Sequence, residues 1–409
     1  MNPTLYSVVL VTSLVNLGNC WADGFIGDSR VRFEARNFYY NADFREGSGV
    51  SKREEWAQGL LMNVESGFTP GTVGFGLDVL AFAGFQLDSS PDRSGSGLLP
   101  RRASGEAAGE YTKAGGRLKF KVSNTIVRYG MSLPKVPVLQ YNNSRLLPQT
   151  FQGWQVSSTE LNRLNLNFAQ FDQAITPDST NLQDISLAVN NGRYPATGIG
   201  DHFRYGGGNY TFNSRWLGSY YYGELSDVYR QQFLGLTYSR RSGSGSVLTD
   251  LRAFASGDVG DAKAGKVDNR AYAGVLSYTF DSGHSLMVTY QLIKGGTGFP
   301  YINNPYLPNY VQYHDFGSAG ERSWQLRYGY DFAPQGLPGL TFFTAYIKGD
   351  GLKAAAGDRE WERDVELAYA FHAGLKGLSV RWRNATYRSE VARDIDENRL
   401  IVSYTFTSF

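Results

Sequence analysis

Arginines recur at alternate positions beside apolar residues, a spacing that suits the conduction of anions. Eight of them follow this pattern: Arg30, Arg32, Arg36, Arg163, Arg252, Arg327, Arg381 and Arg383. Each guanidinium offers a planar fork to a carboxylate, so arginines along one wall can pass a small anion from one to the next. The alternative is a polar wall facing water, on which scattered charges have no specific role. Both interpretations place the arginines on one surface.

Signatures of enzymes and of metal sites are weak. The four histidines are His202, His284, His314 and His372, and no H-E-x-x-H, G-x-S-x-G or P-loop motif is present. The one cysteine, Cys20, lies close to the N-terminus, which leaves the rest of the chain without a disulfide or a cysteine nucleophile. A net charge of +2 gives no basic excess for nucleic acid. We expect no catalytic residue, cofactor, metal or nucleic-acid partner.

Strands of alternating polarity must position the arginines. Apolar rows of period two recur along the chain, for example at 31–35, 73–87, 164–168, 274–280, 286–292, 324–330, 365–371, 380–382 and 400–406. Many such segments have about ten residues, enough to cross a bilayer at a tilt, and Tyr, Trp and Phe gather near their ends. The chain also has 27 Tyr and 48 Gly, with a mean hydropathy of -0.34. These features favour a transmembrane antiparallel β-barrel over a soluble sandwich.

The connections alternate between short and long, as in outer-membrane barrels. Short turns are predicted at 66–71, 281–284, 333–339 and 373–377, and long polar loops at 41–55, 88–110, 191–213, 294–320, 349–362 and 388–398. A sheet in lipid must close because an open edge leaves backbone groups unsatisfied. Residues 23–409 provide for about 16 to 18 strands at ~20 residues per strand and connection.

The N-terminus indicates export. Residues 1–22 contain no Asp, Glu, Lys or Arg, and an apolar core begins at Val8. This resembles a secretory signal peptide cut between Ala22 and Asp23. We therefore predict a signal peptide at 1–22, a single barrel domain at 23–409, and the outer membrane of a Gram-negative cell as the location. The final strand, 398–409, ends in Phe, as does the signal read by the outer-membrane assembly machinery.

Two loops are too apolar, aromatic or proline-rich for ordinary surface loops. Residues 131–154 hold three prolines, which exclude a central strand, together with Lys135, Tyr141 and Arg145. We predict that this segment folds inward and narrows the barrel. Residues 295–320 hold a second proline- and tyrosine-rich run that includes Tyr301 and Tyr306. That run either packs on the barrel mouth or forms a second part of the constriction.

Several stretches together resemble the OprD-type substrate-specific porins of pseudomonads, also called Occ channels, over essentially the whole chain after residue 22. The stretches are 36–41, 55–59, 69–76, 134–139, 145–151, 266–270, 320–327, 361–364, 381–388 and 396–401. The resemblance implies an all-β barrel of about 18 strands with loops folded into the lumen. It also implies a basic ladder that guides carboxylate-bearing solutes to a narrow eyelet.

The resemblance gives roles to single residues. Arg36, Arg381 and Arg383 match the ladder, in agreement with the alternation, which adds Arg163 and Arg327. The predicted eyelet combines both loops: Lys135, Tyr141, Arg145, Tyr301, Tyr306, Tyr313 and Asp315. Ala42 stands where many members of the family have Arg, and the second loop is shorter than usual near residues 303–305. The resemblance therefore does not define which substrate this chain transports.

These observations lead to one functional hypothesis and its alternatives. We expect a channel for facilitated diffusion of small carboxylates, in particular monocarboxylic aromatic acids such as benzoate. The alternatives are a channel for basic amino acids and small peptides, an outer-membrane barrel enzyme, and an adhesive barrel with a plugged lumen. The expected partners are the solutes, outer-membrane lipid or lipopolysaccharide, and the assembly machinery. The pore is expected to be a monomer or a loose trimer.

Overall fold

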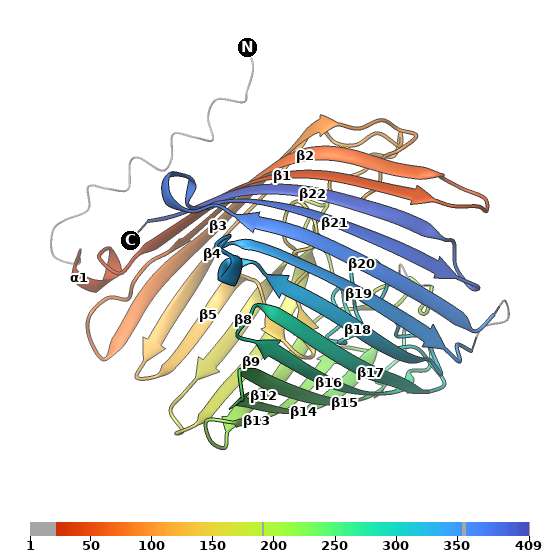
Figure 1. Cartoon of the computed structure of the whole chain (residues 1–409). Coiled ribbons are helices and arrows are strands. Elements are labelled where there is room, and N and C mark those ends of the chain that lie inside the picture. The colour runs from red at the N-terminus through yellow and green to blue at the C-terminus, as the bar shows by residue number, and fades with distance from the viewer. Residues whose placement is uncertain (1–21, 190–191, 354–356, 409) are drawn as a thin grey trace, which may run out of the picture.

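Eighteen antiparallel strands close into one barrel (Figure 1), in a computed structural model that describes residues 22–189, 192–353 and 357–408. The barrel closes where β1 (Arg30–Phe44) pairs with β22 (Ile395–Ser408). The other strands, in chain order, are β2 (Lys52–Glu65), β3 (Val73–Asp88), β4 (Glu110–Val122), β5 (Thr125–Ser132), β8 (Thr150–Ser158), β9 (Leu164–Ile175), β12 (Phe203–Thr211), β13 (Trp216–Leu225), β14 (Tyr229–Ser242), β15 (Gly245–Asp258), β16 (Asp268–Phe280), β17 (His284–Gly295), β18 (Arg322–Asp331), β19 (Leu340–Asp350), β20 (Arg359–Ala370) and β21 (Leu378–Ser389). The predicted all-β barrel of about 18 strands is confirmed.

The two faces of the strands differ as the alternation predicts. Outward apolar side chains remain exposed, such as Leu276 on β16 and Val288 on β17, at 54% and 52%. Their neighbours Val275 and Thr289 point inward and are buried. Alternate residues lie on opposite faces of a strand, and only lipid can satisfy an apolar face of this extent. No helix in the described part of the chain is long and apolar enough to cross a membrane.

The barrel has two unlike ends. One end, here called the short-turn end, carries α1 (Ala22–Phe25), the C-terminal end of β22, the 3-10 helices η3 (Ala333–Gln335) and η4 (Ala373–Leu375), and the connections 66–72, 123–124, 159–163, 212–215, 243–244, 281–283, 332–339 and 371–377 (Figure 1). The other, here called the long-loop end, carries the longer loops 89–109, 133–149, 176–202 and 296–321.

Four loop predictions need correction. The segment 191–213 is not one loop, because it contains β12, where Gly206, Gly207 and Gly208 interrupt the alternation that would reveal a strand. The loop predicted at 41–55 is shorter, because β1 and β2 extend over most of it and leave only 45–51. The loops predicted at 349–362 and 388–398 are also shorter, because β20 begins at residue 359 and β21 and β22 leave only 390–394. The polar outward residues Asn41 and Asp43 belong to β1 and continue its ladder with β2.

The longer loops fold into the lumen and pack against its wall. Leu98 and Leu146, from two different loops, are fully buried in one cluster with Phe38 of β1 and Phe82 of β3. A second cluster joins Phe299 of loop 296–321 to Phe254 of β15. Small ladders stiffen the loops: β6 (Lys135–Val136) with β7 (Leu139–Gln140), and β10 (Ile185–Ser186) with β11 (Ile199–Gly200). The lumen therefore contains a packed hydrophobic core at the long-loop end.

Candidate functional site

The loop of residues 133–149 enters the lumen between β5 and β8. Arg36 on β1 donates hydrogen bonds from Nη1 to the backbone oxygens of Arg145 and Leu146, at 2.9 and 3.2 Å. Lys113 on β4 donates from Nζ to the oxygen of Pro148, at 3.0 Å. Two inward cations of the wall thus bind carbonyl groups of the loop, which would otherwise be buried without partners. The inward fold predicted for 131–154 is confirmed for 133–149, but residues 131–132 and 150–154 belong to the wall strands β5 and β8.

Glycines on the wall make room for this loop. A Cβ at Gly59 on β2 would lie 3.2 Å from Leu146 Cδ1, and one at Gly223 on β13 would lie 2.9 Å from Val138 Cβ. Larger side chains at these positions would displace the loop. Because β2 and β13 are separated by several strands around the barrel, the loop reaches across the lumen.

The loop of residues 296–321 follows the inner wall from β14 to β22. Gln231 on β14 donates to the oxygen of Pro300, and Arg252 on β15 to that of Tyr306, at 3.1 and 3.0 Å. Gln291 on β17 donates to the oxygen of Phe316 at 2.6 Å. These inward side chains satisfy backbone groups of the loop along its length. The loop is therefore part of the lumen wall and does not pack on the barrel mouth.

Inward carboxylates bind the far part of the same loop. Glu362 on β20 accepts the backbone N–H groups of Tyr313 and His314, at 2.8 and 2.9 Å. Asp364 accepts the N–H of Gln312 at 3.0 Å. Glu362 is fully buried, so its two oxygens satisfy loop N–H groups that cannot reach water. β20 thus fixes the position of residues 312–314.

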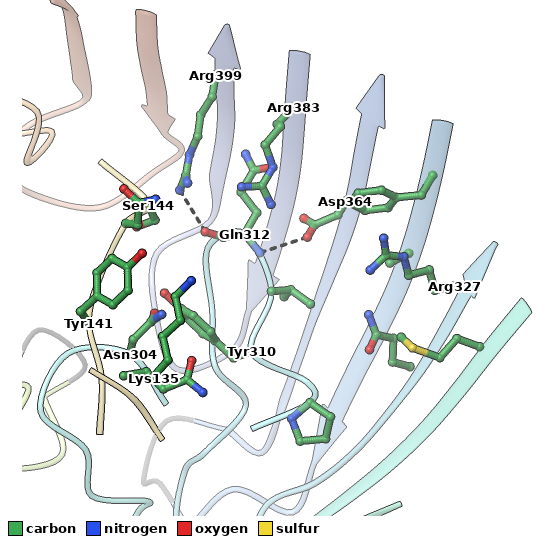
Figure 2. A pocket seen from close by; sticks show the side chains of 18 residues that line it. Lys135, Tyr141, Ser144, Asn304, Tyr310, Gln312, Arg327, Asp364, Arg383 and Arg399 are labelled. Atoms are coloured by element: carbon green, nitrogen blue, oxygen red, sulfur yellow. Dashed lines mark hydrogen bonds between the residues drawn. The ribbon is translucent and has the colours of Figure 1, made fainter. Parts of the chain in front are cut away.

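The two loops meet in the lumen. Asn142 Nδ2 donates to Asn303 Oδ1 at 2.9 Å, and Gln140 forms a β-bridge with Asn304. A cavity of about 470 Å³ lies between this junction and the wall of β17 to β22. Figure 2 shows its residues, which include Lys135, Tyr141, Tyr310 and Gln312 from the loops and Arg327, Asp364, Arg383 and Arg399 from the wall.

A second cavity adjoins the first. It has about 260 Å³ and is lined by Arg32, Glu34 and Arg36 of β1 together with apolar residues of β2 and β3. Lys135, Tyr141 and Asn143 line both cavities. The tip of loop 133–149 therefore stands between two water-accessible spaces, which is the position of a constriction in a pore.

Most arginines of the wall are paired with carboxylates. Arg36 Nε lies 2.8 Å from Glu34, Arg383 Nε lies 3.1 Å from Glu366, and Arg399 Nε lies 2.6 Å from Glu397. Arg381 also faces Glu366, at 3.6 Å. These pairs reduce the charge that each arginine offers to a passing solute.

Lys135 and Arg327 differ from these arginines. Within the described residues neither has a carboxylate in ion-pair distance. Lys135 Nζ lies 5.3 Å from the ring centroid of Tyr141, and Arg327 Cζ lies 3.8 Å from that of Phe343. Both line the larger cavity, and Lys135 is exposed. The uncompensated positive charge of the cavity is thus carried by one loop cation and one wall cation, each beside an aromatic ring.

Asp315 lies in a buried polar cluster behind the cavity. Arg193 of loop 176–202 pairs with both of its carboxylate oxygens, and Tyr301 donates from its hydroxyl at 2.7 Å. Burial opposes the charge of Asp315, but Arg193, with help from His314 and Tyr301, holds the pKa of Asp315 below its usual range. Burial and the neighbouring Asp315 raise the pKa of Tyr301 well above its usual value. The cluster joins two loops of the lumen.

Replacing Arg193 by methionine is expected to lower the free energy of unfolding by about 3–5 kcal/mol at pH 7, because a buried carboxylate loses its partner. The lowered pKa of Asp315 means that its stabilising contribution is present above about pH 4 and is lost only on stronger acidification. In the variant burial is opposed only by His314 and Tyr301, so the pKa of this carboxyl rises. The deficit should therefore shrink between pH 7 and pH 4.5, as followed by urea unfolding in detergent.

Arg322→Met is the matched control for that experiment. Arg322 pairs with Asp350 at 2.6 Å, but both side chains are exposed, and exposed pairs contribute about 0–1 kcal/mol. Its effect should be small and independent of pH in this range. A deficit of Arg193→Met that matches that of Arg322→Met, or that stays constant from pH 7 to 4.5, contradicts the assignment of the buried pair.

The structure separates the predicted ladder residues into groups. Arg327 and Arg383 line the larger cavity and Arg36 the smaller one. Arg381 points to the same face as Arg383 but is exposed and lines neither. Arg163 stands in the turn before β9 with a φ of 64° and donates to the oxygen of Phe212 at 3.2 Å, away from both loops.

The predicted eyelet residues are also divided. Lys135 and Tyr141 line both cavities. The others contact neighbouring loops or the wall and line neither cavity: Arg145 lies over the ring of Tyr40, Tyr301 bonds Asp315, Tyr306 packs under Arg252, Tyr313 contacts Tyr387, and Asp315 pairs with Arg193.

Most residues that line the larger cavity were absent from the predicted site, and Arg399 and Gln312 show two different reasons. Arg399 is on the same strand as the outward residues Leu400 and Val402 but has the other parity. The alternation therefore already placed its side chain on the lumen face. Gln312 had no such signal, because its position depends on hydrogen bonds to Asp364 and Arg399, which lie far away in the chain (Figure 2).

Comparisons with known proteins agree with this architecture. The family model described as "outer membrane porin, OprD family" matches residues 23–408. Porin D of Pseudomonas aeruginosa is 35% identical over 417 residues, covering 94% of this chain and 92% of the relative. The crystal structure of OccK9 (OpdG) of Pseudomonas aeruginosa superposes with a TM-score of 0.91 at 44% identity, covering 94% of this chain and all of that one.

A ligand-bound structure is also similar. OpdK of Pseudomonas aeruginosa with vanillate is 36% identical, with a TM-score of 0.88, and the match covers 94% of this chain and 100% of that one. The family model and these relatives extend over nearly the whole chain, and the barrel, its strand number and its inward loops are those that the resemblance implied. The chain therefore belongs to the OprD family of outer-membrane porins.

Proposed function

We propose that this porin conducts small monocarboxylates, with aromatic acids such as benzoate as the preferred solutes. The observation that carries the proposal is the position of Lys135 and Arg327, two cations without a carboxylate partner among the described residues, in the larger cavity. A carboxylate entering the cavity can pair with either cation without first displacing an acid. The mechanism is passive diffusion through a site that binds weakly enough to release its solute.

The aromatic surface of the cavity supports the choice of aromatic acids. Tyr141, Tyr310 and Phe343 line it beside the two cations. A ring can pack against these side chains while its carboxylate faces a cation. The vanillate in the OpdK structure is an aromatic carboxylate as well, which makes the same class of solute reasonable for this chain.

Basic amino acids and small peptides are the second candidate class. Asp364 lines the larger cavity. Glu34 lines the smaller cavity. A cationic side chain of a solute could pair with these acids. We rank this class second because each of these carboxylates already has a partner: Asp364 accepts the N–H of Gln312, and Glu34 pairs with Arg36.

Liposome swelling tests the choice between the two classes. Vesicles containing the purified porin should swell several times faster in isotonic benzoate than in isotonic arginine, because the unpaired charge of the cavity is positive. Sodium gluconate and protein-free vesicles give the baseline. Faster swelling in arginine than in benzoate would favour the second class, and hydrolytic activity without conductance would contradict a channel.

We propose three further properties of the chain: its export signal, its route of insertion and its oligomeric state. Residues 1–21 lie outside the described residues, and we propose that 1–22 form a cleaved signal peptide ahead of one barrel domain, 23–409. We also propose that the outer-membrane assembly machinery inserts the chain and that the pore is a monomer or a loose trimer. Single-channel recordings with one or three equal current steps would distinguish these last two states.

A further inference from the structure

Five consecutive strands each place one basic residue on the outward face at the long-loop end. These residues are Arg270 of β16, Lys294 of β17, Arg322 of β18, Lys348 of β19 and Arg359 of β20, here called the basic band. All five are exposed. Each shares the alternation of outward residues on its strand, such as Leu276 on β16 and Leu326 on β18. The basic band therefore faces the surroundings of the barrel and not the lumen.

Each member of the basic band lies on the loop side of an outward aromatic residue. The aromatic residues are Tyr272, Tyr290, Trp324, Tyr346 and Trp361, one on each strand. Arg270 is directly opposite Lys294 in the strand register, and Lys348 is opposite both Trp324 and Trp361. Aromatic girdles mark the boundary between hydrocarbon and headgroups. The basic band is thus at the depth of lipid headgroups.

Two members of the basic band have acidic neighbours. Arg322 pairs with Asp350 at 2.6 Å, and Arg359 lies 3.6 Å from Asp358. Both pairs are exposed and leave little net charge. Arg322 and Arg359 therefore belong to the basic band by position but add little to its positive charge.

The other three members are uncompensated. Within the described residues, Arg270, Lys294 and Lys348 have no carboxylate in ion-pair distance. Asp268 shares the face of Arg270, but its Oδ2 accepts the N–H of Gly296 at 3.3 Å. Three positive charges are therefore available to a ligand beside the lipid.

The other half of the same strands lacks such charges. Outward positions of β16 to β20 at the short-turn end hold residues such as Tyr278, Leu286, Tyr330, Phe342 and Tyr369, and no lysine or arginine. Arg363, nearer the middle of β20, donates to Asn384 and Thr386 and lies on the hydrocarbon side of Trp361. A general need for solubility would place charges at both ends. The asymmetry indicates an anionic ligand at one membrane surface only.

We propose that the basic band binds the phosphate groups of a phosphorylated glycolipid in the leaflet at the long-loop end. Long loops of such barrels face the outside, so this is the outer leaflet. Guanidinium and ammonium groups form charge-assisted hydrogen bonds to phosphate oxygens, and the flanking aromatic side chains contact the adjoining sugar and acyl carbons. The proposal is independent of which solute passes through the lumen.

The test compares binding of bisphosphorylated lipid A by three forms of the full barrel in detergent. One is the wild type, and one is Arg270→Gln/Lys294→Gln/Lys348→Gln. The control is Arg215→Gln/Arg240→Gln/Lys376→Gln, which removes three exposed charges at the short-turn end that also lack a carboxylate partner among the described residues. Native mass spectrometry gives the bound lipid, and tryptophan fluorescence during heating gives the stabilisation. Bilayer conductance checks that each barrel is folded and open.

We expect the substitutions in the basic band to weaken lipid A binding about a hundredfold and to abolish the thermal stabilisation. The control should bind like the wild type, and all three forms should conduct equally. Equal weakening in both triple variants would reduce the effect to net charge and overturn the proposal. So would unchanged binding in the first variant, or an equal stabilisation of the wild type by millimolar inorganic phosphate alone.

Discussion

Replacement of Lys135 and Arg327 together by glutamine is expected to lower benzoate flux about tenfold and to shift the channel toward cations. The two side chains are the uncompensated cations of the larger cavity among the described residues. Two charges 4 Å apart interact by about 1 kcal/mol in water and about 4 kcal/mol at an effective permittivity of ~20. A loss of about 1.4 kcal/mol at the barrier corresponds to tenfold in rate. Reversal potentials in a salt gradient and swelling rates measure both effects.

Arg163→Gln/Arg240→Gln is the matched control, since it removes two exposed arginines at the short-turn end. Arg163 was predicted to belong to the ladder, but its side chain bonds the turn at Phe212. Neither reversal potential nor benzoate flux should change. A normal anion preference in the Lys135/Arg327 variant, or an equal loss in the control, would contradict the assignment of the two cations. Such a result would transfer selectivity to the ion-paired arginines.

Glu362→Ala is expected to widen the pore. Glu362 accepts two backbone N–H groups of residues 313–314 and is fully buried. A buried N–H group that loses its acceptor costs about 1–3 kcal/mol, and the variant leaves two N–H groups without this partner. Loop 296–321 should then leave the wall of β20 in part of the population. Single-channel conductance should rise about twofold, and larger aromatic carboxylates should enter.

Glu366→Ala separates this effect from a change of charge. Glu366 lies on the same strand and face, but its carboxylate pairs with Arg381 and Arg383 and not with the loop. Its removal should increase anion preference and leave the size limit unchanged, as measured by swelling with neutral sugars of increasing size. If Glu362→Ala leaves this limit at the wild-type value, β20 does not hold the constriction.

The sequence by itself determined the architecture of the wall. Alternation assigned Arg36, Arg327 and Arg383 to the inner face correctly, because a period of two depends only on neighbours in one strand. The prolines and apolar residues of 131–154 likewise predicted burial away from a central strand, which is correct for 133–149 but not for 150–154, which begin β8. β12 was missed because Gly206, Gly207 and Gly208 provide no alternating side chains.

Only the tertiary structure decided which of these residues meet at the constriction. Alternation gives the face of a residue but not its height in the barrel, so Arg163 and Arg383 looked alike although one lies in a turn. The loop positions depend on partners distant in sequence: Arg36 with Leu146, and Gln312 with Glu397. Asp315 was expected in the pore but is buried against Arg193. Such contacts form only when the closed barrel brings its walls around the loops, and a local pattern of residues does not contain them.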